Sequence, residues 1–522
     1  MVHPNKSRRS KKVDHFTWRT NGSLSGAEAS QVECLLGRAE ARLQVQSADL
    51  DQDHSLLSAE IHSYKIALAP HKRLPPEVLA IIFVNYVATP VILPPSPHEP
   101  ALALAATCRS WRSIVLNIPN LWSNIFLDFS CCPTPLKLLE YAKLWLSRSE
   151  NTLITLRNSS ARWSERSMQK ANVDPMLYLV APYIARCREI DMRFLEASID
   201  EFFSFPAGSI EHLEVLYLET LGFSMPFTHA SGQPLEVFRS APCLRRVLFS
   251  TDLCSIDPHV LGLPWGQLTG LHFIATYIPP LAMHAILRES AALRECSFSI
   301  IQLDDALAAA LDRLPECVLP ALHTLMVEFS PQTVDYAPFL RPLVLPALTD
   351  LELRPLEAGV LPQCPWSQRA YAGLLARSGF ALRRLAILHY MIAPRDLDAV
   401  LRGMPSLADL HLYLWKTTPW DVGILHALGT GALLPRLETI TFSTYPLPDV
   451  LAALEARVRC GGTGGVARLK AANMAVTWRH DIKLEAMAQF MQLAEGGGPV
   501  CRAFAHTRAY AHDRETMQIR AS

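Results

Sequence analysis

The side chains that most often carry chemistry are plentiful in this sequence but do not form a catalytic or metal-binding pattern. The 522 residues include 18 histidines and 12 cysteines. The histidines form no H-E-x-x-H motif and no pair with a carboxylate at metal-ligand spacing, and no G-x-S-x-G elbow for a nucleophilic serine occurs. The cysteines include no C-x-x-C pair, so neither a zinc ribbon nor a redox motif is visible. We therefore expect no catalytic residues, no metal site and no cofactor.

A glycine cluster, Gly461 to Gly465, is the one feature that resembles a phosphate-binding loop. No lysine–serine pair follows it, and no strand-to-helix fingerprint surrounds it. We interpret it as a flexible connection after a helix that ends near Cys460.

Composition narrows the choice of partners and of fold class. Half of the residues are hydrophobic, 19% are charged, 38 are prolines, and the formal net charge is zero. This composition favours a buried, many-turned fold over a disordered chain and gives no bulk attraction to nucleic acid or membranes. The most apolar stretch, residues 78–93, is interrupted by a proline and is too short to span a bilayer. We predict a cytoplasmic or nuclear protein without nucleic-acid or membrane partners.

The segment best suited to bind a partner lies between residues 74 and 122. Pro75 and Pro76 fit the first turn of a helix, and apolar residues then recur at three- and four-residue spacing. A second helical pattern runs over residues 101–118. About fifty residues bury too little surface to be stable alone, so this group of short helices should carry more apolar surface than it can hide.

The sequences LPPE, IIF, CRSWR and LW in this segment resemble an F-box, the docking segment of cullin-type ubiquitin ligases. The connection over residues 89–100 is longer and richer in proline than a typical F-box turn. The alternative is an ordinary helical hairpin inside a larger core. The resemblance implies binding to a Skp-family adaptor and, through it, to a cullin. The residues that it implies at this adaptor interface, in contact or as braces, are Leu74, Pro75, Pro76, Glu77, Leu79, Ile82, Phe83, Leu104, Cys108, Trp111, Arg112, Leu121 and Trp122.

The N-terminal sequence divides into a tail and a helical segment. Residues 1–26 are polar, with a basic cluster that is either a nuclear signal or part of a solvated, disordered tail. Residues 27–69 contain no proline, and we predict a single amphipathic helix that lays its apolar stripe on the F-box or the first repeats, with a coiled coil as the alternative. The stripe consists of residues spaced by seven, namely Leu36, Leu43, Leu50, Leu57 and Tyr64.

The rest of the chain repeats the pattern L-x-x-L-x-L. The copies start 24 to 34 residues apart, which matches a leucine-rich repeat with one strand and one helical return per unit. Three large side chains per copy, at ~1.5–3 kcal/mol each, would hold stacked units together. The copies are Cys187-Ile190-Met192, Leu213-Leu216-Leu218, Leu244-Val247-Phe249, Leu268-Leu271-Phe273, Leu293-Cys296-Phe298, Leu322-Leu325-Val327, Leu348-Leu351-Leu353, Leu382-Leu385-Ile387, Leu407-Leu410-Leu412 and Leu437-Ile440-Phe442.

These patterns predict an α/β fold in which a short helical F-box over residues 70–128 precedes an irregular leucine-rich-repeat solenoid over residues 129–470. The solenoid would be a parallel β ladder with helical returns. The remaining residues, 471–522, should form a capping helix and a tail. Two segments, WLSRS at 145–149 and LPWGQLTGL at 263–271, resemble fungal, basidiomycete-type F-box proteins.

Side chains between the last two positions of each repeat should point away from the helices and could meet a protein substrate, although a solvated surface would have the same pattern. The predicted contacts are Tyr217, His272, Met326, Glu352 and His411. The F-box resemblance implies a substrate-recognition adaptor of an SCF-type ubiquitin ligase. The alternatives are an F-box scaffold that acts outside the ligase and an enzyme hidden in the solenoid. Fold class alone does not identify the substrate.

Overall fold

The computed structural model forms two compact units, residues 1–189 and 190–522, and each is considered by itself. The basic tail cluster and Leu50 lie outside the described residues. The structure describes residues 24–45, 51–128, 135–159, 175–195, 201–221, 235–250, 258–300, 305–329, 336–355, 364–388, 390–413, 420–443, 447–476, 484–494 and 498–505.

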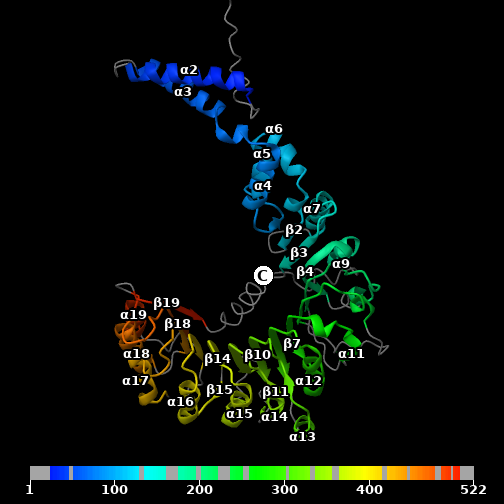
Figure 1. The fold of residues 1–522 in the computed structure, drawn as a ribbon, viewed down its shortest axis with the longest axis vertical. Helices are drawn as coiled ribbons and strands as arrows, with labels where there is room; N and C mark the ends of the chain where they lie inside the picture. The colour runs from blue at the N-terminus through cyan, green and yellow to red at the C-terminus, as the bar shows by residue number, and fades with distance from the viewer. Residues whose placement is uncertain are drawn as a thin grey trace, which may run out of the picture. The chain divides into compact units, whose positions relative to one another are not determined.

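The first unit begins with two helices where the sequence predicted one. Helices α2 (Gly26–Val45) and α3 (Asp51–Ala67) lie side by side (Figure 1). Lys65 pairs with Glu40 at 3.0 Å, and Arg73 pairs with Glu33 at 3.0 Å, which is the order expected of an antiparallel hairpin. The prediction of a single helix over 27–69 was therefore wrong.

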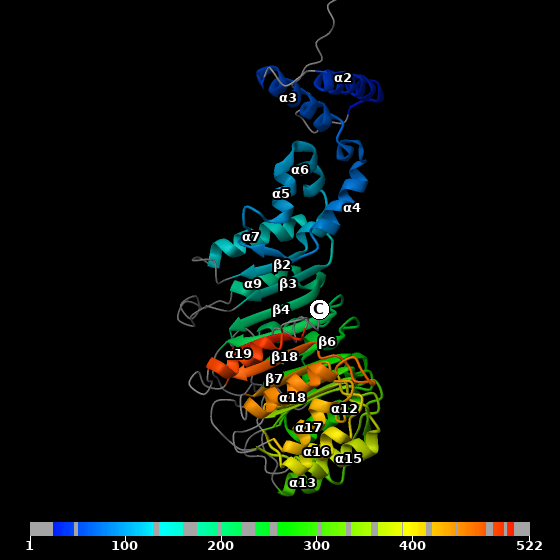
Figure 2. The same ribbon diagram turned by 90° about the vertical axis from the view of Figure 1, so that its left-hand side faces the viewer.

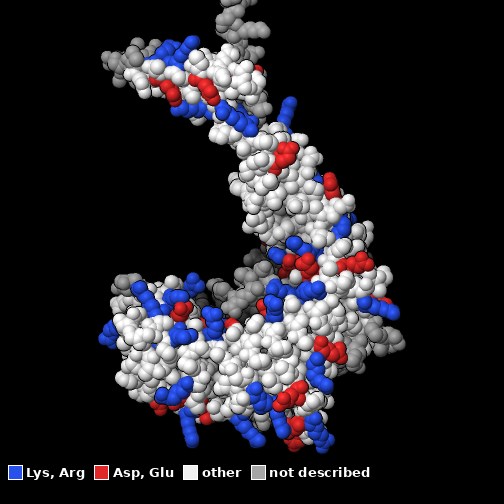
Figure 3. Space-filling view, in the orientation of Figure 1, with Lys and Arg blue, Asp and Glu red and all other residues white. Residues whose placement is uncertain are grey.

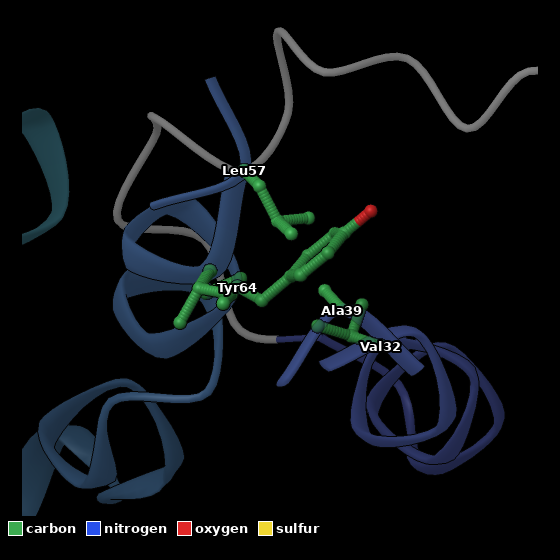
Figure 4. Close-up of a cluster of buried hydrophobic side chains, with 6 residues drawn as sticks. Val32, Ala39, Leu57 and Tyr64 are labelled. Carbon is green, nitrogen blue, oxygen red and sulfur yellow. The ribbon is translucent and has the colours of Figure 1, made fainter. Parts of the chain in front are cut away.

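The leucine stripe of this segment packs against itself. Leu57 and Tyr64 of α3 contact Val32 and Ala39 of α2 in a small buried cluster, and Leu36 and Leu43 border it (Figure 4). Folding back buries the stripe within the hairpin, which a straight helix could do only against another surface. Burial raises the pKa of Tyr64 to about 12.

The F-box-like segment consists of short helices and two short strands. They are η1 (Pro70–Arg73), α4 (Pro76–Tyr86), β1 (Val91–Leu93), α5 (Pro100–Thr107), α6 (Arg109–Leu116), η2 (Pro119–Trp122) and β2 (Asn124–Asp128).

Strand β1 lies in the proline-rich connection, where the sequence predicted only a loop. It pairs in parallel with β2, so that Val91 is opposite Ile125 and Leu93 is opposite Leu127. These four side chains are buried. Strand β2 pairs in turn with β3 (Ile154–Ser159), also in parallel. Helices α5, α6 and η2 are therefore the helical return of a strand–helix–strand unit, and the F-box-like segment is built into the sheet.

The first unit continues with α7 (Pro135–Arg148), β3, α9 (Pro175–Val180) and η4 (Ala181–Arg186). Helix α7 lies next to β2 in both ribbon views (Figures 1 and 2). Strand β4 (Cys187–Leu195) then begins.

The second unit alternates strands with short helices, and the helices cover one face of its strands (Figure 1). Its long strands are β5 (Val215–Leu221), β6 (Arg246–Ser250), β7 (Gly270–Tyr277), β8 (Glu295–Ile300), β10 (Thr324–Phe329), β12 (Asp350–Pro355), β14 (Arg384–Leu388), β16 (Asp409–Tyr413), β17 (Thr439–Ser443), β18 (Ala471–Val476) and β19 (Val500–Ala505). Its main helices are α12 (Pro280–Glu289), α13 (Asp305–Leu311), α15 (Gln368–Ser378), α16 (Pro394–Arg402), α17 (Val422–Thr430), α18 (Leu447–Cys460) and α19 (Leu484–Gln492).

The predicted parallel solenoid is confirmed. Within the described residues, 15 strands follow one another in chain order in one sheet, and every pairing described is parallel. The second repeat position of one strand lies opposite that of the next, as Leu325, Leu351 and Leu385 do on β10, β12 and β14. These side chains are buried between the sheet and its helices.

The solenoid is longer at both ends than the sequence predicted. Strands β1, β2 and β3 precede the first recognised copy, and β18 and β19 follow the last. Helix α19, predicted as a cap, is instead a return between two strands. The last two strands escaped notice because a small side chain occupies the second repeat position in each, as at Ala472 and Cys501, which lie opposite each other.

Candidate docking site

Helix α4 is apolar on both faces, and only one face is covered. Leu79 and Phe83 are buried, whereas the side chains at the helical spacing of residues 78, 81, 82 and 86 are exposed. The exposed fractions are 39% for Val78, 63% for Ile81, 46% for Ile82 and 62% for Tyr86. Few charged side chains lie over this part of the first unit (Figure 3). A contiguous exposed apolar stripe of this kind marks a binding surface. We call these four residues the α4 stripe.

The buried face of α4 is fixed by aromatic packing against α6. The rings of Phe83 and Trp111 lie 4.8 Å apart between centroids, and His71 packs edge-on against Trp111 at 5.9 Å. The orientation of the α4 stripe therefore depends on the position of α6.

Helix α6 is held in place at both ends. At its start, the Sγ atom of Cys108 accepts a hydrogen bond from the Trp111 backbone N–H at 3.3 Å and so caps the helix. The Arg112 side chain donates to the carbonyl of Ala105 on α5 at 2.9 Å. Near its end, the Trp122 indole N–H donates to the Val115 carbonyl at 3.1 Å.

The residues predicted for the adaptor interface occupy three kinds of position. Leu79, Phe83, Leu121 and Trp122 are buried and can only brace the helices. The half-buried ones are Leu74, Leu104, Cys108 and Trp111, and the exposed ones are Pro75, Pro76, Glu77, Ile82 and Arg112. Adaptor contact by the exposed and half-buried residues stays a prediction.

Sequence reasoning left Val78, Ile81 and Tyr86 out of the predicted interface, although they form most of the α4 stripe. Helix α4 carries apolar residues on nearly all of its sides, so their spacing in the sequence could not distinguish its buried face from its exposed face. The signal that was available was the surplus of apolar residues itself.

Two buried charged groups lie beside these helices. Burial lowers the pKa of Lys72, which is 7% exposed. Burial also raises the pKa of Glu99, and a hydrogen bond from the Ile92 backbone N–H acts in the opposite direction. Glu99 thereby satisfies a backbone donor of β1, the first strand of the sheet.

The five predicted substrate contacts in the solenoid do lie in one row across the sheet, but four of them are buried. Exposed fractions are 5% for Tyr217, 7% for His272, 1% for Met326 and 6% for Glu352. These four side chains are covered, so their contact with a substrate stays a prediction, and of the five only His411 is partly exposed, at 20% of its side chain. Strand pairing gives the row as Tyr217, Leu248, His272, Ser297, Met326, Glu352, Ala386 and His411.

A chain of ion pairs explains how charged side chains are tolerated here. Arg354 donates to Glu328 at 2.7 Å and lies 3.4 Å from Glu352. Glu352 lies 3.4 Å from Arg384, which lies 3.4 Å from Asp409. The chain ends where His411 Nε2 approaches Asp409 Oδ1 at 3.0 Å, and Ser299 donates to Glu328 at the other end. Each buried charge thus has a partner of opposite charge, as low-dielectric surroundings require.

Two buried histidines make stability depend on pH. Burial lowers the pKa of His272 to about 4, with the charge of Arg246 as a second cause, and burial lowers that of His284 to about 4 as well. His272 Nδ1 lies 2.9 Å from Ser297 Oγ, and His284 Nε2 donates to the Phe339 carbonyl at 2.9 Å.

We expect the free energy of unfolding to fall between pH 6.5 and 4, because the unfolded chain binds protons there that the folded chain does not. Each histidine should contribute a loss of about 2 kcal/mol at pH 5 relative to pH 7.5. Chemical denaturation at both pH values measures this loss. His284→Gln, which keeps a donor for Phe339, should show a loss smaller by about 2 kcal/mol than the parent. A His284→Gln protein with the full pH dependence would contradict the assignment, and His323→Gln serves as an exposed control.

The fold defines a class of protein in which a short helical module with an exposed apolar stripe forms the start of a leucine-rich-repeat-like solenoid. Residues 71–128 match the F-box-like family. This match covers α4, which carries the α4 stripe, and α5 and α6. A search of the curated proteins found no match.

Within the described residues, no helix is both long enough and apolar enough to cross a membrane. The same residues contain no cluster of three or more histidine, cysteine, aspartate or glutamate side chains placed to hold a metal ion.

Proposed function

We propose that this protein is a substrate-recognition adaptor of an SCF-type ubiquitin ligase. Its F-box-like domain docks on a Skp-family adaptor, which links it to a cullin, and its solenoid binds a protein substrate. The single observation that carries the proposal is the α4 stripe, because four exposed apolar side chains lie on one helix inside the segment that matches the F-box-like family. F-box adaptors typically leave catalysis to other subunits.

Fewer of the predicted substrate-contact residues are accessible than the sequence suggested. Of the predicted row, His411 is the residue that a partner can reach without moving the others. Asp409 and Arg384 lie beside it and are 26% and 15% exposed. We therefore assign substrate contact first to the strands around β16.

The test is adaptor binding by the full-length chain. Ile81→Ser with Tyr86→Ser should weaken binding to a purified Skp-family adaptor by at least about 30-fold, since exposed aromatic and large aliphatic anchors carry most interface energy. Isothermal titration calorimetry or surface plasmon resonance gives the Kd. Both side chains are more than half exposed, so the thermal unfolding of the variant should match the parent.

Leu56→Ser is the matched control, because Leu56 is 65% exposed on α3, outside the segment that matches the family. This variant should bind the adaptor like the parent. Equal binding by the Ile81 and Tyr86 double variant would refute the docking face. Recovery of a cullin with the parent, and its loss with the double variant, separates a ligase adaptor from a scaffold that acts outside the ligase.

A further inference from the structure

We propose that Trp145 and Arg148 of α7 are positioning residues for adaptor docking, although both lie outside the segment that matches the F-box-like family. The inference rests on the proposed function. It follows from the way in which α7 completes the core beneath the docking helices.

Trp122 is the link between the two parts. Its side chain is fully buried at the end of η2, and its indole N–H donates to the Val115 carbonyl at 3.1 Å. Val115 is itself fully buried near the end of α6. The position of the Trp122 ring therefore fixes the last turn of α6, and α6 in turn supports α4 through Trp111 and Phe83.

Helix α7 holds the other side of that ring. The Trp145 ring packs edge-on against Trp122, with centroids 5.5 Å apart and planes at 70°. The Arg148 guanidinium carbon lies 4.9 Å from the Trp122 centroid and 5.8 Å from the Trp145 centroid, so one cation contacts both indoles. Cation–π and edge-to-face contacts are directional, so they fix the orientation of a ring as well as bury it.

The backbone makes the same connection. The Thr155 N–H of β3 donates to the Ser123 carbonyl, directly after Trp122, at 2.8 Å. Strand β3 also pairs with β2 along its length. The packed structure that supports the α4 stripe therefore includes α7 and β3 and ends at Ser159.

The Trp145 indole N–H indicates which property of this side chain matters for the position of Trp122. Among the described residues, the buried Trp145 indole N–H has no hydrogen-bond partner. The useful property of this side chain is then its aromatic face, which phenylalanine shares. Trp145→Phe should therefore preserve docking, whereas Trp145→Ala should not.

The test measures the Kd of the full-length chain for a purified Skp-family adaptor. Arg148→Met keeps the aliphatic stem but removes the cation, and it should weaken binding about three- to tenfold. Trp145→Ala should weaken it at least as much. Arg148→Lys and Trp145→Phe should stay within about twofold of the parent, because each keeps the interaction with Trp122.

Lys143→Met is the matched control on the same helix. Lys143 makes its cation–π contact with another ring, that of Tyr178, which is 63% exposed and whose centroid lies 4.6 Å away. Loss of the Lys143 charge in Lys143→Met should leave the Kd for the adaptor unchanged. The inference is overturned if Arg148→Met binds like the parent, or if Lys143→Met weakens binding equally.

A second measurement does not depend on the adaptor. Amide hydrogen exchange over residues 112–118 should be faster in Arg148→Met and Trp145→Ala than in the parent, and unchanged in Lys143→Met and in both conservative variants. If the parent binds no Skp-family adaptor, the proposed function fails, and this exchange pattern alone decides whether α7 positions α6. Parent-like exchange in Arg148→Met would overturn the inference.

Discussion

Replacing Arg457 by methionine should lower the free energy of unfolding by about 4 kcal/mol, one of the two largest losses expected from a single substitution in this chain. Arg457 is fully buried on α18. Its Nη2 donates to the carbonyls of Leu434 at 2.8 Å, Pro435 at 3.0 Å and Leu437 at 3.4 Å. Its Nη1 donates to the carbonyls of Leu428 and Leu433, each at 3.4 Å.

The physical reason is that this guanidinium donates hydrogen bonds to backbone carbonyls at the end of α17 and in the turn that follows. Burial lowers the pKa of Arg457. Methionine fills a similar volume but leaves at least two buried carbonyls without a donor, at about 1–3 kcal/mol each.

Chemical denaturation of the parent and of Arg457→Met measures the effect. Arg459→Met is the control, because Arg459 is exposed on the same helix and should change stability by less than about 0.5 kcal/mol. Equal stability of Arg457→Met and the parent would show that the turn after α17 is satisfied by other donors.

A charge placed in the strand ladder should be as damaging. Leu351→Asp is expected to cost at least about 4 kcal/mol, because it removes a core side chain and buries a carboxylate without a partner. Leu351 is 2% exposed and lies between Leu325 and Leu385 of the neighbouring strands. A thermal melt compared with that of the parent measures the loss.

Val422→Asp provides the comparison for Leu351→Asp. Val422 is also apolar, but it is 76% exposed at the start of α17, and the same charge there should change stability by less than about 0.5 kcal/mol. Similar melts for the two variants would be incompatible with a buried row at Leu351.

The sheet could be predicted from the sequence in the middle of the solenoid, where large aliphatic residues recur at a fixed spacing. Leu351 and its counterparts lie in the predicted register, and helical returns follow the strands as predicted, for example α12 and α16. Prediction stopped short of the C-terminal end of the solenoid, where Ala472 and Cys501 occupy the same row. A small side chain can be buried in a strand, but it does not distinguish a strand from a loop.

The candidate site was predictable only in outline. The motifs located the docking segment, but they could not identify its accessible face, since Leu79 and Ile82 look alike in sequence and only Leu79 is buried. The burial of most of the predicted substrate row could not be predicted for a related reason. Glu352 was expected to be accessible because it lies between the repeat positions Leu351 and Leu353, but Arg354 and Arg384 on the same and the next strand allow it to be buried.

Strand β1 has a consequence for domain grafting. A fusion that carried only residues 71–128 to another protein would take β1 and β2 without β3, and β2 would lose its partner on one side. The free edge would offer backbone donors and acceptors to other chains, which is a recognised route to aggregation. A transplantable docking cassette therefore has to end after Ser159, and its exit point is then a strand that a recipient solenoid could continue.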